Sequence, residues 1–379
     1  MEAIKARLKA GMMAVALGLA VLAPWSLATA QQSDGDWNQV VAAAKQEGKV
    51  IVWGEAGDSR TAFWKDAFEK AYPGIKVELF QAPLNSQRDN RYAEEYKAGI
   101  FKADVFVTGG ASALTRFMPA NMVQPIKPLL RPDILDPAHW TTKGGPAWID
   151  KQHQYVLVGD ALTYPTATVN AKVTDLNSYE DLLSPKYDGK IVMADPFKSG
   201  SGFAFVLFLL QEHGLGPDYI RKFFKNKRIV FNDDDRTLVD WVSSGRALVG
   251  LNLRPQDVTS LQEIGGKLKI VGPLTVSGQK VGFTIGSDGV IWLPAIRPLP
   301  HPNATRVYVN WFYSVAGQQA MVNSLDIGTN VAGVDLSKVS KWSQPLQGVN
   351  YMNLMQEDLL KPDVAASLRK FIAQVMTGN

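Results

Sequence analysis

Residues 177–202 read Asn-Ser-Tyr-Glu-Asp-Leu-Leu-Ser-Pro-Lys-Tyr-Asp-Gly-Lys-Ile-Val-Met-Ala-Asp-Pro-Phe-Lys-Ser-Gly-Ser-Gly, and this stretch carries the clearest structural signal in the chain. Ile191 to Ala194 form an apolar run short enough for a buried strand, bounded by Gly189 and Pro196. A helix is predicted to follow residues 199–202, which places backbone N–H groups of that loop at the positive end of the helix dipole. The stretch therefore predicts a short helix, a buried strand and a loop that favours an anionic or carbonyl group of a ligand.

Short apolar runs alternate with helical patterns along most of the chain. In the first part, strands are predicted at residues 50–53, 76–80 and 103–107, with helices from about residue 59 and over 85–98. A second set has strands at residues 166–169, 191–194, 229–231, 247–251 and 268–271, with helices between them. A strand at 290–294 and one long helix over 304–323 follow. Repeated β-α-β units indicate an α/β protein with mostly parallel sheets flanked by helices.

Two of these segments resemble family 1 extracellular solute-binding proteins, the periplasmic receptors of ABC importers. Residues 177–202 resemble the middle of that family, with Tyr179 where the family often has Trp, and Val309 to Gln318 resemble its long C-terminal helix. The resemblance covers essentially the whole chain after residue 30. It implies the type II periplasmic binding protein fold, in which two α/β lobes are joined by hinge crossings, expected here near residues 159–164 and 283–289.

The resemblance also implies a division of the chain into lobes. Lobe 1 is expected to comprise residues 31–160 together with 290–345, and lobe 2 residues 161–289. Residues 346–379 are expected to form a C-terminal helical segment that packs on a lobe.

The N-terminus has the features of a signal peptide. Lys5, Arg7 and Lys9 precede an apolar run, and Ala28-Thr29-Ala30 matches a cleavage site, so cleavage after Ala30 and a periplasmic location are expected. The apolar run is shorter than the roughly 20 residues that a spanning helix needs. Since the chain has no cysteine, disulfides, thiolate metal sites and a lipid-anchored form are excluded. After residue 30 the chain holds 37 basic and 35 acidic residues, a balance that argues against nucleic acid as a partner.

Loops at the carboxyl ends of the strands and at the crossings are the expected ligand site, because open α/β sheets bind ligands there. Arg254 follows a strand and is suited to hold a carboxylate or phosphate through two parallel hydrogen bonds, or alternatively forms an ion pair with Glu55 or Asp257. Glu55 itself either pairs with a ligand ammonium group or has a structural partner. The candidate ligand-binding residues are Glu55, Gly109, Gly110, Tyr164, Thr166, Ser199, Gly200, Ser201, Asn252, Arg254 and Asn330.

Enzymatic and metal sites find little support. The four histidines lack zinc-binding spacing, and neither a Gly-x-Ser-x-Gly elbow nor a phosphate-binding P-loop occurs, so no catalytic residue, cofactor or metal ligand is assigned. Ferric-binding members of the family use adjacent tyrosines near the position of residues 252–254, whereas this chain has no Tyr-Tyr pair and Arg254 would repel a cation. Residues 232–235, Asn-Asp-Asp-Asp, are interpreted as a charge cluster at a helix entry.

These observations lead to one principal functional hypothesis. The chain is expected to be a periplasmic substrate-binding protein that captures a small organic solute between two lobes, with a preference for an anion such as a carboxylate, phosphonate or sugar phosphate. The closed form of the monomer is expected to dock on an inner-membrane ABC permease. The alternatives are a ligand-sensing subunit for a membrane kinase, and a receptor for thiamine or polyamine, with Glu55 and Trp53 as the contacts, or for ferric iron.

Overall fold

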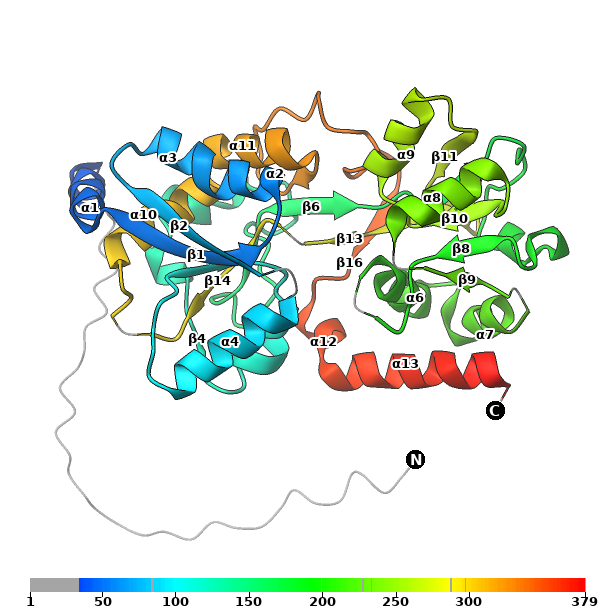
Figure 1. The fold of residues 1–379 in the computed structure, drawn as a ribbon, viewed down its shortest axis with the longest axis horizontal. Coiled ribbons are helices and arrows are strands. Elements are labelled where there is room, and N and C mark those ends of the chain that lie inside the picture. Colours follow the sequence, from blue (N-terminus) through cyan, green and yellow to red (C-terminus); the bar gives the residue numbers. More distant parts are fainter. Residues whose placement is uncertain are drawn as a thin grey trace, which may run out of the picture.

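The computed structural model describes residues 34–82, 85–198, 200–226, 228–232, 234–286, 288–296 and 298–378. These residues form two lobes that lie side by side, each built on its own sheet (Figure 1). None of the helices in this described part combines the length and the apolar character that crossing a membrane requires. The predicted signal peptide lies outside the described residues.

The first lobe is built on a six-stranded sheet in the order β2-β1-β3-β14-β4, with β5 also paired to β14. Its strands are β1 (Lys49–Glu55), β2 (Lys76–Ala82), β3 (Val105–Val107), β4 (Val123–Gln124), β5 (Leu157–Val158) and β14 (Val290–Pro294). One buried cluster joins this sheet to α1 (Asp34–Glu47), η1 (Ala62–Ala67), α3 (Phe68–Ala71), α10 (Pro302–Tyr313) and α11 (Val315–Leu325). Another joins it to α4 (Asn85–Lys97) and η2 (Ala113–Phe117). The short elements of this lobe are α2 (Asp58–Thr61), η3 (Lys127–Leu129), α5 (Pro132–Leu135) and η4 (Pro137–His139).

The second lobe is built on a five-stranded sheet in the order β11-β7-β10-β8-β9. Its strands are β7 (Ala167–Asn170), β8 (Ile191–Met193), β9 (Val230–Phe231), β10 (Val249–Leu251) and β11 (Leu268–Gly272). One buried cluster includes residues of α6 (Ser201–Gln211), α7 (Gly216–Asn226) and α13 (Pro362–Thr377), and another includes residues of α8 (Asp235–Ser244) and α9 (Pro255–Glu263). Ahead of β8, the predicted short helix forms two turns, η5 (Asp181–Leu183) and η6 (Pro185–Tyr187), because Pro185 cannot continue the first one.

A third sheet connects the lobes. Its order is β12-β13-β6-β15, with β16 also paired to β13, and its strands are β6 (Asp160–Thr163), β12 (Thr275–Val276), β13 (Gln279–Ile285), β15 (Gly328–Thr329) and β16 (Asn350–Asn353). Strands β6 and β13 run between the two lobes (Figure 1). After β16, α12 (Glu357–Leu360) contacts η2 of the first lobe and α13 packs on α7 of the second. The C-terminal segment therefore touches both lobes.

The two lobes, the α/β class and the mostly parallel sheets agree with the sequence prediction, but the sheet of each lobe contains one strand that runs opposite to the others. In the first lobe β14 pairs antiparallel with β3, β4 and β5, and in the second lobe β7 pairs antiparallel with β10 and β11. Both strands directly follow a strand of the connecting sheet. The chain thus enters each sheet from the edge where the parallel strands end, and must run in the opposite direction.

The single long helix predicted over residues 304–323 is also wrong, because the structure has two helices, α10 and α11. Ser314 lies between them in extended conformation and its side chain accepts a hydrogen bond from the N–H of Gly317, 3.1 Å away, as an N-cap. A β-carbon at Gly317 would lie 1.9 Å from the carbonyl oxygen of Trp311. Only glycine fits this tight junction, so Ser-x-x-Gly is the local signal for the break.

Candidate functional site

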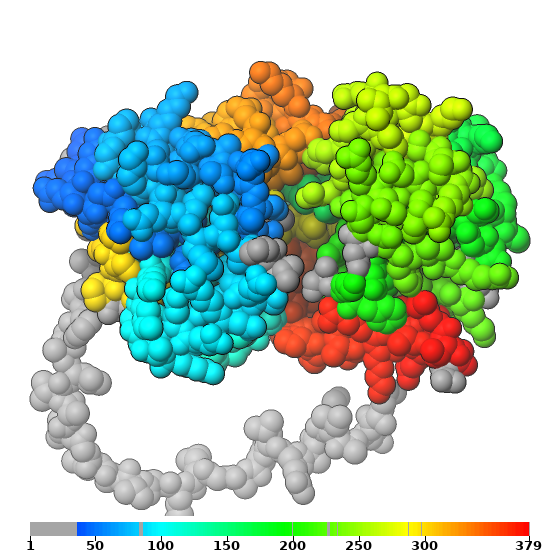
Figure 2. All heavy atoms as spheres, viewed as in Figure 1, coloured from blue at the N-terminus to red at the C-terminus, as the bar shows by residue number. Residues whose placement is uncertain are grey.

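A cavity of about 380 Å³ lies at the edge of the second lobe that faces the first. Its lining comes from the ends of β8 and β10, from the starts of α6 and α8, and from the residue after β6: Tyr164, Ala194, Asp195, Lys198, Gly200, Ser201, Gly202, Asp235 and Arg254. Tyr164 packs against the cores of both lobes, which places the cavity where they meet. Figure 2 shows the first lobe, in blue and cyan, facing the green second lobe across a hollow. The volume suits a small organic solute.

Two glycines shape the entry into α6. Gly200 has φ 141° and ψ −160°, a conformation that other residues rarely adopt, and a β-carbon there would meet open space. At Gly202 a β-carbon would lie 2.2 Å from the carbonyl oxygen of Ala194, so the first turn of α6 lies directly against the end of β8. The N–H groups of this first turn, including that of Ser201, have no partner within the helix and point toward the N-terminal side. The cavity therefore contains a helix N-terminus suited to an anionic group. Ser199, which was predicted to contribute here, lies outside the described residues.

Arg254 follows β10 and has a side chain that is 53% exposed. Its Nε lies 3.8 Å from Oδ2 of Asp235, which is too far for a hydrogen bond. Burial acts to lower the pKa of Arg254, but Tyr164, Asp235 and Asp257 hold that pKa above its ordinary value. The predicted ion pair with Glu55 is wrong, since the carboxylate within 4 Å is Asp235, while Asp257 acts only at longer range. The guanidinium thus retains donors for a ligand.

Glu55 lies across the cleft, in the first lobe, and has a structural partner. Its Oε2 is 3.3 Å from Nη2 of Arg60, whose Nε also lies 2.5 Å from Oδ1 of Asp288. Nη1 of Arg60 donates to the carbonyl oxygen of Ala56 at 3.1 Å. Burial acts to lower the pKa of Arg60, yet Asp288 and Glu55 hold it above its ordinary value. These three side chains therefore form an ion network that joins the loop after β1 to the segment between β13 and β14.

The other predicted residues of the first lobe and the hinge lie outside the lining of the cavity that the structure describes. A β-carbon at Gly109 would meet open space, whereas one at Gly110 would lie 2.7 Å from Cδ1 of Ile149, so Gly110 is needed for packing. Asn330 is held on the connecting sheet, because its Nδ2 donates to the carbonyl oxygen of Asp160 at 2.7 Å.

Thr166 and Asn252 lie at the ends of the paired strands β7 and β10, and both are buried. Thr166 accepts a hydrogen bond from the hydroxyl of Tyr179 at 3.3 Å, and its carbonyl oxygen accepts one from the N–H of Asn252. Asn252 has φ 52°, and neither polar atom of its amide has a hydrogen-bond partner among the residues that the structure describes. A buried amide without a hydrogen-bond partner lowers the stability of the folded state. Of these two residues, Asn252 is therefore the one whose side chain has hydrogen-bonding groups left for a ligand.

Sequence reasoning missed five lining residues: Ala194, Asp195, Lys198, Gly202 and Asp235. Asp195 and Lys198 follow a predicted strand, so the strand-end rule would have found them. Asp235 begins α8, which its neighbour Asp234 caps by accepting a hydrogen bond from the N–H of Thr237 at 2.6 Å. Burial raises the pKa of the Asp235 carboxyl. The charge cluster is thus a helix entry, but one of its side chains also lines the cavity.

Trp53, the proposed wall for thiamine or polyamine, is 2% exposed and packs among Phe80 and Phe106. No three histidine or acidic side chains gather as a metal site within the part of the chain that the structure describes.

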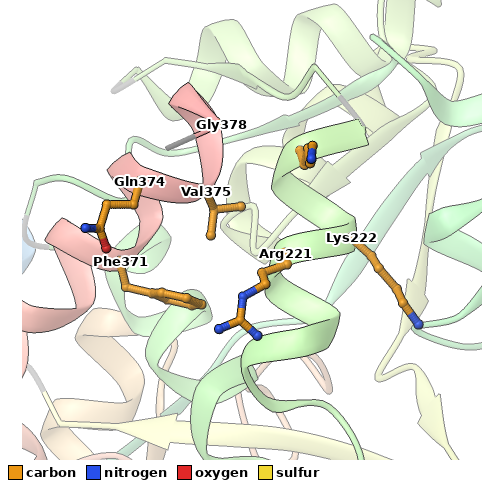
Figure 3. Close-up of a pocket in the computed structure, with 7 residues that line it drawn as sticks. Arg221, Lys222, Phe371, Gln374, Val375 and Gly378 are labelled. Carbon is orange, nitrogen blue, oxygen red and sulfur yellow. The ribbon is translucent and has the colours of Figure 1, made fainter.

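A second hollow, of about 430 Å³, lies between α7 and α13 on the second lobe alone (Figure 3). Arg221 of α7 lies over the ring of Phe371 of α13, 5.3 Å from its centroid, and pairs with Asp218. Because helices of a single lobe line this hollow, closure of the lobes would not enclose a solute there.

Comparison with known proteins identifies the family. Residues 63–346 match the family described as "Bacterial extracellular solute-binding protein". The chain belongs to this family. The sequence-based recognition and the two-lobed fold are thereby confirmed, and binding of a solute outside the cytoplasm follows as the general function. No curated protein matches the chain.

Solved structures show the same fold at low sequence identity. The Trichodesmium protein FutA, in complex with iron and citrate, has a TM-score of 0.63 and 18% identity, covering 86% of this chain and 99% of FutA. Iron-bound HitA from Pseudomonas aeruginosa has a TM-score of 0.61 and 16% identity, covering 86% and 99%. AfuA from Actinobacillus pleuropneumoniae, with fructose-6-phosphate bound, has a TM-score of 0.59 and 15% identity, covering 87% and 99%. At these identities the similarity shows the fold and leaves the ligand to be argued from the site.

Proposed function

We propose that this solute-binding protein captures a small organic solute with an anionic group in the cavity between its lobes and delivers it to an ABC permease. The observation that carries the proposal is the juxtaposition of the exposed Arg254 guanidinium with the N-terminus of α6, both lining one cavity. A carboxylate or phosphate placed there accepts charge-assisted hydrogen bonds from Arg254 and from the N–H groups of the first turn. Fructose-6-phosphate and citrate, which are present in two of the similar structures, are anions of these classes.

The remaining parts of the proposal concern export and assembly. Cleavage after Ala30 would release the protein into the periplasm as a monomer. Contacts of one solute with both lobes would provide the differential affinity that closure requires. The first-lobe surface that meets the solute includes the loop after β1, where Ala56 and Gly57 are exposed.

A thermal-shift screen of residues 31–379 tests the proposal, because a ligand bound only by the folded state raises the melting temperature. The ligands tested one at a time are carboxylates, phosphonates and sugar phosphates, and amines and thiamine for comparison. Citrate is tested both alone and as ferric citrate. A shift with one of the anions is the expected result. A shift confined to amines, or to ferric citrate without citrate, would overturn the anion assignment.

Titration calorimetry with the anion that shifts the melting temperature then tests Arg254. Arg254→Ala should weaken binding at least about tenfold, since a charge-assisted hydrogen bond contributes roughly 1.5–3 kcal/mol. Arg236→Ala is the matched control, because Arg236 is exposed on α8 and lies outside the cavity lining. Equal affinity of Arg254→Ala and the wild type would exclude Arg254 as the anchor.

A further inference from the structure

Among the described residues that line the cavity, acidic and basic side chains are equal in number. Asp195 and Asp235 line it together with Lys198 and Arg254. A site made for a plain anion would be expected to carry an excess of positive charge. The balance here means that an anion bound to Arg254 also faces carboxylates.

Asp235 lies in the first turn of α8, where the helix dipole favours a negative charge, but its carboxylate has unused hydrogen-bonding capacity. Asp195 has a local role, because its Oδ1 accepts a hydrogen bond from the N–H of Phe197 at 2.9 Å. Asp234, rather than Asp235, caps α8. No residue in the described part of the chain donates a hydrogen bond to the Asp235 carboxylate, and its closest cation, Arg254, stays at 3.8 Å. Its side chain is 33% exposed, toward the cavity that it lines.

The carboxylates on the opposite side of the cleft are already neutralised. Glu55 and Asp288 share the guanidinium of Arg60, with contacts of 3.3 Å and 2.5 Å. A ligand ammonium group would have to break that network to reach Glu55. Asp235, by contrast, gains hydrogen bonds from a cationic group without losing any.

We propose that the solute carries a cationic group beside its anionic one, and that Asp235 binds the cationic group while Arg254 binds the anionic group. This inference rests on the anion-binding function proposed above and names the chemical class of the solute as a zwitterion, such as an aminocarboxylate or an amino phosphate ester. Because the two protein charges lie only 3.8 Å apart, the two charged groups of the solute are joined by a short linker. The anionic group of the solute neutralises Arg254, and its ammonium group neutralises Asp235. The Asp235 carboxylate therefore no longer repels the bound anionic group.

Titration calorimetry with matched probes tests the inference. The probes are propanoate, 3-aminopropanoate and propylamine, and in a second series ethyl phosphate, phosphoethanolamine and ethylamine. Wild-type protein should bind the zwitterion of at least one series about tenfold or more tightly than the corresponding anion. Asp235→Asn should lower the affinity for that zwitterion about tenfold and raise the affinity for the plain anion, because a repelling carboxylate is lost.

The matched control is Asp240→Asn, since Asp240 is exposed on the same helix and lies outside the cavity lining. It should leave both affinities unchanged, and thermal melts should show that each variant is folded. Equal binding of anion and zwitterion, with no effect of Asp235→Asn, would overturn this inference and leave the anion receptor intact. If every anion and zwitterion fails to bind while an amine alone does so, both this inference and the proposed anion function fail.

Discussion

The two faces of the cleft use their charged residues differently. On the first lobe, Arg60 is satisfied by Asp288, Glu55 and a backbone carbonyl, and its side chain is 22% exposed. On the second lobe, Arg254 is 53% exposed and has no carboxylate within hydrogen-bond distance among the described residues. One arginine holds a loop in place, whereas the other interacts with the Tyr164 hydroxyl and retains donors that no carboxylate of the described residues occupies.

This difference predicts separate roles for the charged residues of the two lobes. Arg60 joins the loop after β1 to Asp288, which lies between β13 of the connecting sheet and β14 of the first lobe. The first lobe thus presents a surface fixed to the hinge, whereas the second lobe presents the groups that we propose bind the anionic part of the solute. We therefore expect substitutions on the first lobe to change stability, and substitutions at the cavity of the second lobe to change affinity.

The largest effect is expected at Gly202, where a side chain would break the geometry of the second-lobe site itself. In Gly202→Ala the β-carbon would meet the backbone oxygen of Ala194 at 2.2 Å, a contact that no side-chain rotation relieves. The free energy of unfolding, measured in urea, should fall by about 3 kcal/mol. Gly109→Ala, whose β-carbon meets open space, should stay within about 0.5 kcal/mol of the wild type. Equal stability of the two variants would contradict the close approach of α6 to β8.

Arg60→Ala should separate stability from affinity. The substitution leaves the carboxylate of Asp288, which is 12% exposed, without its guanidinium partner, so the free energy of unfolding should fall by about 2 kcal/mol. Affinity for the solute should change less than about threefold, because Asp288, Glu55 and the carbonyl oxygen of Ala56 already occupy the Arg60 guanidinium. If Arg60→Ala instead loses as much affinity as Arg254→Ala, the division of tasks between the lobes is wrong.

Glu69 provides a pH test of the first-lobe framework. Although burial acts to raise its pKa, hydrogen bonds from Lys65, from the N–H of Val77 and from Lys76 lower it to about 2. The folded state therefore favours the ionised carboxylate. The resulting stabilisation is complete above the ordinary pKa of glutamate and is lost as the pH falls toward about 2.

Glu69→Gln should accordingly lower the free energy of unfolding by roughly 1–2 kcal/mol at pH 7. The difference in unfolding free energy between wild type and variant should shrink as the pH falls from about 5 to 3. Glu78→Gln is the control, because the Lys49–Glu78 pair is exposed and should contribute at most about 0.5 kcal/mol. A gap between wild type and Glu69→Gln that stays constant with pH would show that the ionised carboxylate is not the stabilising form.

Local sequence patterns were sufficient for the lobes and for much of the site, because strands, glycines and strand-end residues are local features. Arg254, Gly200 and Ser201 were found in this way, and the structure brings them together with Tyr164 in one cavity. Partners distant in sequence could not be found. The pairing of Arg60 with Asp288, 228 residues away, depends on how the hinge returns the chain to the first lobe.

Asp235 shows a second limit of prediction from the sequence. Its sequence context is that of a helix entry, and that interpretation is correct for Asp234. The position of the Asp235 side chain beside Arg254 follows from the packing of α8 against β10, which no short pattern encodes. The antiparallel direction of β7 and β14 was missed for a similar reason, since it depends on the edge at which the chain enters each sheet.

A crystal structure of the wild-type protein with the anion or zwitterion that gives the largest thermal shift would show directly which arginine binds the anionic group. We expect the anionic group within hydrogen-bond distance of the Arg254 guanidinium and of the first N–H groups of α6, with the Arg60–Asp288 pair still intact. An anionic group bound to Arg60, with that pair broken and Arg254 left without a ligand contact, would contradict this expectation.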